Sequence, residues 1–134
     1  MSNAAKFLSQ LQAEAGLADP AEAETLARSV MTSLRDRLTP EEARDLEAQL
    51  SPAMRALWQG SPMLALFHRA TGPVRMSYQE FIDKVASEMG VPAERAEAMI
   101  RIVFRLLKAA ISPGEVEDVA SQLPKKLKVA WLEA

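Results

Sequence analysis

Apolar residues recur along this chain at intervals of three and four positions, while β-branched and aromatic residues are scarce. An α-helix completes a turn every 3.6 residues, so this spacing collects the apolar side chains on one face of a helix. In the first half of the chain the stripes are Phe7, Leu8, Leu11 and Ala15; Leu26, Val30, Leu34 and Leu38; Ala43, Leu46 and Leu50; and Met54, Leu57 and Trp58. The pattern predicts consecutive helices and an all-α fold.

The predicted helix starts share a polar signature. A capping residue stands three positions before a glutamate in the pairs Asp19 and Glu22, Thr39 and Glu42, Ser77 and Glu80, and Ser112 and Glu115. This is the pattern of a capping box, in which each of the two side chains accepts a hydrogen bond from a backbone N–H at the helix start. Proline follows the cap in three of these pairs, where its missing N–H costs least. We therefore expect Glu42 and Glu115 to act as cap residues.

The second half of the chain repeats the first. A shift of 74 residues aligns the stripe that begins at Phe7 with the one at Phe81, and a shift of 73 aligns the remainder as far as Trp58 and Trp131. Apolar positions, caps and turns are all kept, which predicts a tandem duplication of a unit of about four helices. The predicted parts are a first repeat at 4–59, a docked linker at 60–76 and a second repeat at 77–133.

The size of one repeat indicates how the two are packed. A unit of about 55 residues buries only about 60% of its unfolded surface and is marginal alone. The segment Ala98–Ile111 is also apolar around most of its circumference, so it must be contacted on several sides. We expect one globular helical bundle, a single domain over residues 1–134, with a shared core and approximate two-fold pseudo-symmetry.

The linker between the repeats is expected to be a short docked helix with the polar His68 at its edge. It contains four apolar residues that are unfavourable in water, Met63, Leu64, Leu66 and Phe67.

The repeated pattern is a Phe-led helix that ends in Gly, a long apolar helix, a Ser/Thr-Pro helix start, an Asp before an apolar residue, and a Gln-Leu pair. The second copy carries it at Phe81–Gly90, Ser112-Pro113, Asp118-Val119 and Gln122-Leu123-Pro124, and the first at Phe7–Gly16, Thr39-Pro40, Asp45-Leu46 and Gln49-Leu50. The pattern resembles the bacterial family catalogued as domain of unknown function 2267, over nearly the whole chain. The first copy departs from it at Ser51, where the second has Pro124. The resemblance implies an all-helical domain of two tandem repeats and brings no activity with it.

Composition narrows the classes of function. The chain has 134 residues, a formal net charge of −2 and no cysteine, which excludes disulfides, thiolate catalysis and cysteine-ligated metals. No stretch approaches the roughly 20 apolar residues that span a bilayer, and the N-terminus lacks the features of a signal peptide. We expect a cytoplasmic protein with no membrane association.

Residues for catalysis or metal binding are sparse. His68 is the only histidine, has no glutamate three positions before it, and has no evident serine partner. The five glycines form no phosphate-binding loop. We therefore assign no catalytic, cofactor-binding or metal-binding residue.

Two polar sets remain as candidate surfaces. The first recurs in both copies along one edge of the third helix, at Glu42, Asp45, Gln49, Glu115, Asp118 and Gln122. It is interpreted either as a repeat-symmetric binding surface or as caps and contacts between helices.

The second set is basic and comprises Lys125, Lys126, Lys128, Arg101, Arg105 and Lys108. Lys125 and Lys126 fall in the first turn of a helix, where positive charge opposes the helix dipole, and this can mark an anion or partner contact. The alternative is that these side chains are solvated or paired with the acidic third helices.

Function is not determined by these features. The leading hypothesis is a non-catalytic protein-interaction or regulatory module that binds another protein or itself. The alternative is a binder of a small anion or of nucleic acid through the basic set; nucleic acid is disfavoured by the net charge.

Overall fold

The computed structural model describes residues 3–134, except for the side chains of Asn3, Pro62, Leu64 and Ala65. Over these residues the chain is helical without any strand, which confirms the all-α prediction. The helices are α1 Asn3–Ala15, α2 Pro20–Arg37, α3 Pro40–Glu47, α4 Pro52–Gln59, α5 Pro62–Thr71, α6 Tyr78–Met89, α7 Ala93–Lys108, α8 Pro113–Ser121 and α9 Lys125–Glu133. The expectation for the side chain of Leu64 lies outside the described residues.

Helix starts follow the predicted capping residues. The side chains of Asp19, Thr39, Ser77 and Ser112 each accept a hydrogen bond from the backbone N–H three residues later. Ser51 does the same for α4. A side-chain hydroxyl or carboxylate at this position satisfies one of the donors that a helix start leaves unpaired. Local sequence therefore determines where most of these helices begin.

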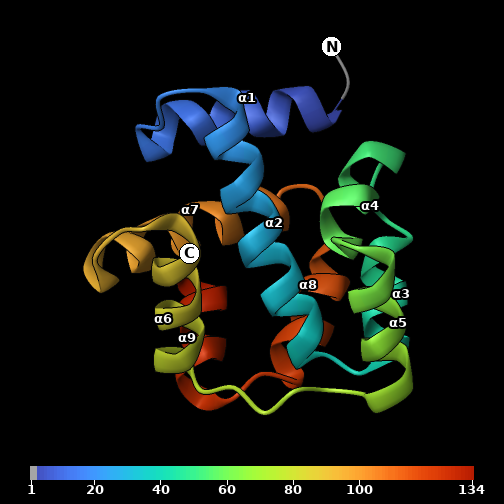
Figure 1. Ribbon diagram of the computed structural model, residues 1–134. Helices are drawn as coiled ribbons and strands as arrows, with labels where there is room; N and C mark the ends of the chain where they lie inside the picture. Colours follow the sequence, from blue (N-terminus) through green and yellow to red (C-terminus); the bar gives the residue numbers. More distant parts are fainter. Residues whose placement is uncertain (1–2) are drawn as a thin grey trace.

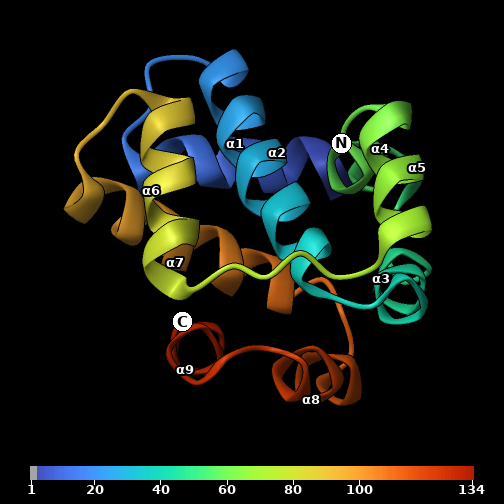
Figure 2. The same ribbon diagram turned by 60° about the horizontal axis from the view of Figure 1, so that its bottom comes forward.

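Helix α2 runs through the middle of the molecule (Figure 1). Helix α1 crosses one end of α2, with α3, α4 and α5 on one side and α6 on the other (Figure 1). Helix α7 contacts α1, α2, α6 and α9, so the prediction that this apolar segment is packed on several sides is confirmed. Helices α8 and α9 lie together at one side of the molecule (Figure 2).

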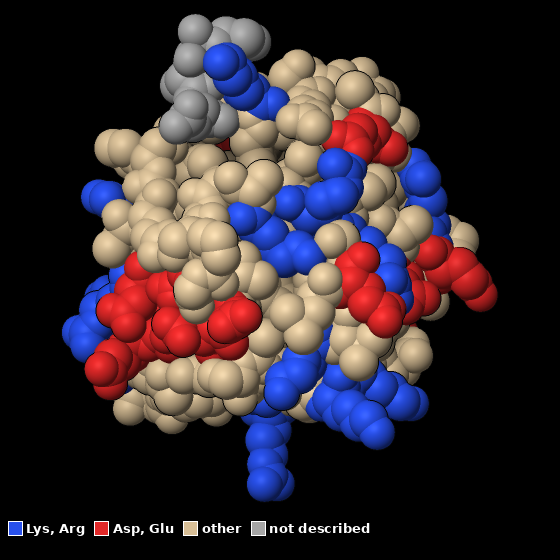
Figure 3. Space-filling model, turned by 180° about the vertical axis from the view of Figure 1, so that it is seen from behind, with Lys and Arg blue, Asp and Glu red and all other residues tan. Residues whose placement is uncertain are grey.

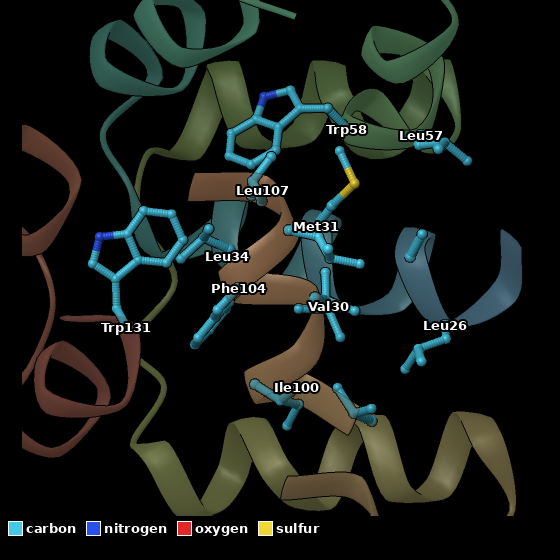
Figure 4. Close-up of a cluster of buried hydrophobic side chains, with 14 of the residues drawn as sticks. Leu26, Val30, Met31, Leu34, Leu57, Trp58, Ile100, Phe104, Leu107 and Trp131 are labelled. Atoms are coloured by element: carbon cyan, nitrogen blue, oxygen red, sulfur yellow. The ribbon is translucent and has the colours of Figure 1, made fainter. Parts of the chain in front are cut away.

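One hydrophobic cluster runs through both halves of the chain. Val30 and Leu34 of α2 lie near Phe104 of α7, and Trp58 and Trp131 point into the cluster from different sides (Figure 4). The ring of Phe104 lies edge-on to the ring of Trp131, with 5.3 Å between their centroids. Trp131 also donates from its indole nitrogen to the Val116 carbonyl at 2.9 Å, so its polar atom is satisfied in the core.

Helix α5 differs from the expectation at the level of its side chains. Its anchor is His68, which is buried and whose Nε2 lies 2.7 Å from the Leu38 carbonyl oxygen. His68 was expected only as a polar residue at the edge of this helix, and the structure shows that it is buried. Three apolar side chains of α5 instead face outward: Met63 is 79% exposed, and Leu66 and Phe67 are each 60% exposed.

Candidate functional site at the α3–α8 seam and the α5 face

Helices α3 and α8 are held together by two reciprocal glutamine contacts. Gln49 accepts a hydrogen bond from the Ser112 backbone N–H at 2.7 Å and donates to the Ser112 hydroxyl at 3.2 Å. Gln122 does the same to Thr39, at 2.9 Å and 3.3 Å. Each glutamine thus binds the capping residue of the opposite helix. We call this contact between α3 and α8 the seam.

The glutamines change the role expected for Glu42 and Glu115. In a capping box the glutamate accepts from the backbone N–H of the capping residue, as Glu80 does for Ser77 at 3.2 Å. At Thr39 and Ser112 that N–H is already bonded to the glutamine of the other helix. The expectation that Glu42 and Glu115 complete capping boxes is therefore incorrect, and both carboxylates are free to face the seam.

The carboxylates of Glu42 and Glu115 lie close to each other and to that of Asp118. Oxygen atoms of Glu42, Glu115 and Asp118 all lie within 4.8 Å of one another. Glu42 is 7% exposed and Glu115 is 5% exposed, whereas Asp118 is exposed. The Oε1 atom of Glu42 is buried and has no hydrogen-bond partner. We call these three residues the carboxylate cluster.

The surroundings of the carboxylate cluster disfavour its negative charge. Burial, then a hydrogen bond with Glu115 and the charges of Glu115, Asp118 and Asp45, raise the pKa of Glu42 to about 8. The ion pairs among the described residues all lie elsewhere in the structure. These surroundings therefore favour the protonated form of Glu42 more than water does.

The six polar residues of the repeated set are thus brought together at the seam. Gln49 and Gln122 form the contacts between helices, while Glu42, Glu115 and Asp118 form the cluster. Asp45 is exposed beside them and acts on Glu42 through its charge. Sequence spacing identified these residues. It did not show that the carboxylates lie close together, because they come from two helices far apart in the chain.

The basic set is divided between paired and exposed side chains. Arg105 forms an ion pair with Glu14 of α1, so it does not pair with the acidic third helices. The Lys108 ammonium donates to the backbone oxygens of Leu132 at 3.2 Å and Ala134 at 2.7 Å, and burial lowers its pKa.

The remaining members of the basic set differ in exposure. Lys125 and Lys126 are exposed in the first turn of α9, as expected, and that helix start has no side-chain cap. Arg101 and Lys128 are half-buried.

A groove of about 540 Å³ lies beside the exposed face of α5. Its walls come from α2, α5, α6 and the residues after α5, and they include Ser29, Phe67, His68, Lys84 and Glu88. The Ser29 hydroxyl is buried at this groove without a hydrogen-bond partner. The groove therefore combines the apolar side chains of Phe67 and Val74 with mostly polar and charged residues.

Arg35 was not identified as important by the sequence. It is buried, pairs with Asp36 at 2.8 Å, and donates to the carbonyl oxygens of Trp58 and Gln59 at the end of α4. An arginine between Leu34 and Asp36 near the end of α2 carries no local signal for this role. Only the packing of α4 against α2 reveals it.

Comparison with known families places the chain. A family model described as uncharacterized conserved protein (DUF2267) matches residues 4–129. The chain belongs to this family. No curated protein matches this DUF2267 chain. Among the helices of the described residues, none is long and apolar enough to cross a membrane. The family description assigns no activity, so the function of this DUF2267 protein must be argued from its surfaces.

Proposed function

We propose that this protein is a non-catalytic interaction module that binds an amphipathic helix of another protein against α5. The observation that carries the proposal is the outward-facing triad of Met63, Leu66 and Phe67. Its spacing of three and one places these side chains along one side of α5, where an apolar stripe of a partner helix could pack. Apolar side chains grouped in this way are more typical of an interaction surface than single exposed residues are.

The groove beside α5 offers a second contact for the same partner. Phe67 lies at its wall and is largely exposed, so a partner side chain entering the groove would contact this ring. The buried Ser29 hydroxyl lacks a hydrogen-bond partner and would gain one from a polar group that enters. An unsatisfied buried hydroxyl is costly, so this bond would favour the bound state.

The charges around α5 indicate the chemistry of the partner. Arg69 and Arg75 are exposed near the end of α5. Arg37 donates a hydrogen bond to the Val74 carbonyl oxygen at 3.0 Å. The pKa of Arg37 is lowered, mainly by its burial and to a smaller extent by the positive charge of Arg75. The positive charge at this end of α5 favours a helix whose apolar stripe is flanked by Asp or Glu.

The test compares two single substitutions in the same pull-down from cell lysate. Leu66→Asp places a charge on the α5 face, and the matched control Leu132→Asp places one on α9, where Leu132 is 48% exposed. We expect one protein to be retained at high salt by wild type and by Leu132→Asp and to be lost from Leu66→Asp. The binding segment of that protein should be an apolar helix with acidic flanks. Equal retention by all three baits would refute the α5 face as the binding surface.

Other occupants give different results in the same experiment. If light scattering shows a dimer that Leu66→Asp dissociates, the partner is a second copy of this chain and not another protein. If only nucleic acid or a small anion is retained, and both high salt and Lys125→Glu/Lys126→Glu remove it, the alternative function through the basic set replaces ours.

We also infer that the chain is a tandem duplication whose halves are related by an approximate two-fold axis. The reciprocal contacts of Gln49 with Ser112 and of Gln122 with Thr39 support this, since each is the counterpart of the other under the shift of 73 residues.

A further inference from the structure

The spacing of the carboxylate cluster fits a single bound cation. Hard divalent ions bind oxygen ligands at about 2.0–2.6 Å, so oxygens around one ion lie roughly 3 to 5 Å apart. The oxygens of Glu42, Glu115 and Asp118 all lie within 4.8 Å of one another. The three residues can therefore share one ion without a rearrangement of α3 or α8.

Glu42 gives independent evidence that the cluster lacks a partner. Its side chain is 7% exposed, and its Oε1 atom has neither a solvent-accessible surface nor a hydrogen-bond donor. Buried oxygens in folded proteins are almost always bonded to a donor or a cation. The carboxylate of Glu42 lies within the group that Glu115 and Asp118 complete, so a cation held there would lie beside this unpartnered side chain.

No basic side chain fills this role. The ion pairs within the described part of the chain use Glu14, Glu24, Asp36 and Glu88 as their acids. Figure 3 shows acidic side chains gathered densely on one area of the face opposite to that of Figure 1, with some Lys and Arg side chains beside that area and others across the rest of the face. None of these ion pairs uses Glu42, Glu115 or Asp118, so no lysine or arginine of the described residues forms an ion pair with the carboxylate cluster.

The backbone around the cluster is already held in place. Gln49 and Gln122 fix the starts of α8 and α3 relative to each other, and Glu115 and Glu42 occupy the first turns of these two helices. Asp118 is exposed at the cluster, so an ion could enter from solvent and keep water in its remaining positions.

We propose that the seam is a binding site for a hard divalent cation, of the class of Ca²⁺, Mg²⁺ and Mn²⁺, with Glu42, Glu115 and Asp118 as its ligands. The ion joins two helices from different halves of the chain and stabilises their contact. Because it lies on α3 and α8, this site is separate from the α5 face and does not depend on the function proposed for that face.

The experiment uses the full chain, first treated with EDTA and then dialysed. CaCl₂, MgCl₂ and MnCl₂ are titrated separately in one buffer, and binding is followed by calorimetry and by thermal unfolding. Saturation with one ion per chain is expected for at least one of them. At a free-ion concentration of 100 times the dissociation constant, the ion should raise the apparent equilibrium constant for folding about 100-fold and increase the melting temperature. NaCl at matched ionic strength should not reproduce this increase.

Substitutions distinguish the site from general binding of cations to acidic surfaces. Asp118→Asn removes an exposed ligand without altering the core and should weaken binding at least 10-fold. The matched control is Glu117→Gln, which makes the same change of charge at an exposed neighbour and should leave the affinity within two-fold of wild type. Glu42→Gln should abolish binding while the chain stays folded. The proposal is overturned if no ion binds with this stoichiometry, if NaCl gives the same shift, or if the two α8 variants lose affinity equally.

Discussion

The seam glutamines should contribute measurably to stability, and in nearly equal amounts. Replacing Gln122 with Ala removes its two hydrogen bonds to Thr39, and replacing Gln49 with Ala removes the corresponding two to Ser112. An intramolecular hydrogen bond contributes about 0.5–1.5 kcal/mol net. The backbone N–H groups left behind are near solvent, so water can partly replace the lost acceptor. We therefore expect each substitution to lower the free energy of unfolding by about 1–2 kcal/mol.

Urea unfolding followed by circular dichroism measures this loss directly, and thermal unfolding provides a second measurement. With an unfolding entropy of about 2.1 cal/mol/K per residue, 1 kcal/mol corresponds to about 4 °C in a chain of 134 residues. Each variant should thus melt about 4–8 °C below wild type. The matched control is Gln10→Ala on α1, an exposed glutamine for which no comparable contact exists. It should change stability by less than about 0.5 kcal/mol.

The seam variants also test why Glu42 is available to the carboxylate cluster. Without Gln122, the Thr39 N–H lacks its acceptor and Glu42 can turn back to form the capping box that local sequence favours. Gln122→Ala should therefore weaken cation binding at the seam, although Gln122 is not a proposed ligand. If both seam variants are as stable as Gln10→Ala, the glutamines do not hold α3 and α8 together and this reasoning is wrong.

Three further substitutions test the charge in the seam and the glycines after α4 and α6. The pKa of Glu42 is raised to about 8, above its ordinary value of 4.5, so the native chain holds this proton more tightly than the unfolded chain does. In EDTA, the contribution of Glu42 to stability should be fully present below about pH 4.5 and be lost as the pH rises towards 8. Glu42→Gln should flatten this profile, and an unchanged slope in urea titrations at several pH values would contradict it. Gly60→Ala should cost at least about 2 kcal/mol and Gly90→Ala about 1 kcal/mol, since both glycines have a φ of 65° but only a Cβ at Gly60 would meet Thr32, at 2.8 Å. If the two variants lose equal stability in thermal unfolding, Thr32 can move away from the added Cβ without cost.

Much of the fold follows from short-range patterns in the sequence. Apolar spacing predicts the helices, and residues such as Thr39 and Ser112 determine where they begin, because a cap depends on atoms within one turn. The burial of Trp58 and Trp131 also agrees with their places on apolar stripes. These features depend on neighbours in the chain, so the sequence alone was sufficient.

The functional surfaces depend on contacts between distant segments. Glu42 carries the local signature of a capping residue, but Gln122 occupies the N–H that it would bind, and Gln122 is 80 positions away in the chain. Leu66 and Phe67 are likewise exposed because α5 packs against the rest of the molecule through the side that carries His68. One backbone N–H can bond to only one of several nearby acceptors, and only some apolar side chains can be buried. The tertiary structure decides which acceptor bonds to the N–H and which side chains are buried. The sequence by itself determined the helices and their caps, whereas only the packing of α3 on α8 brought the carboxylates together.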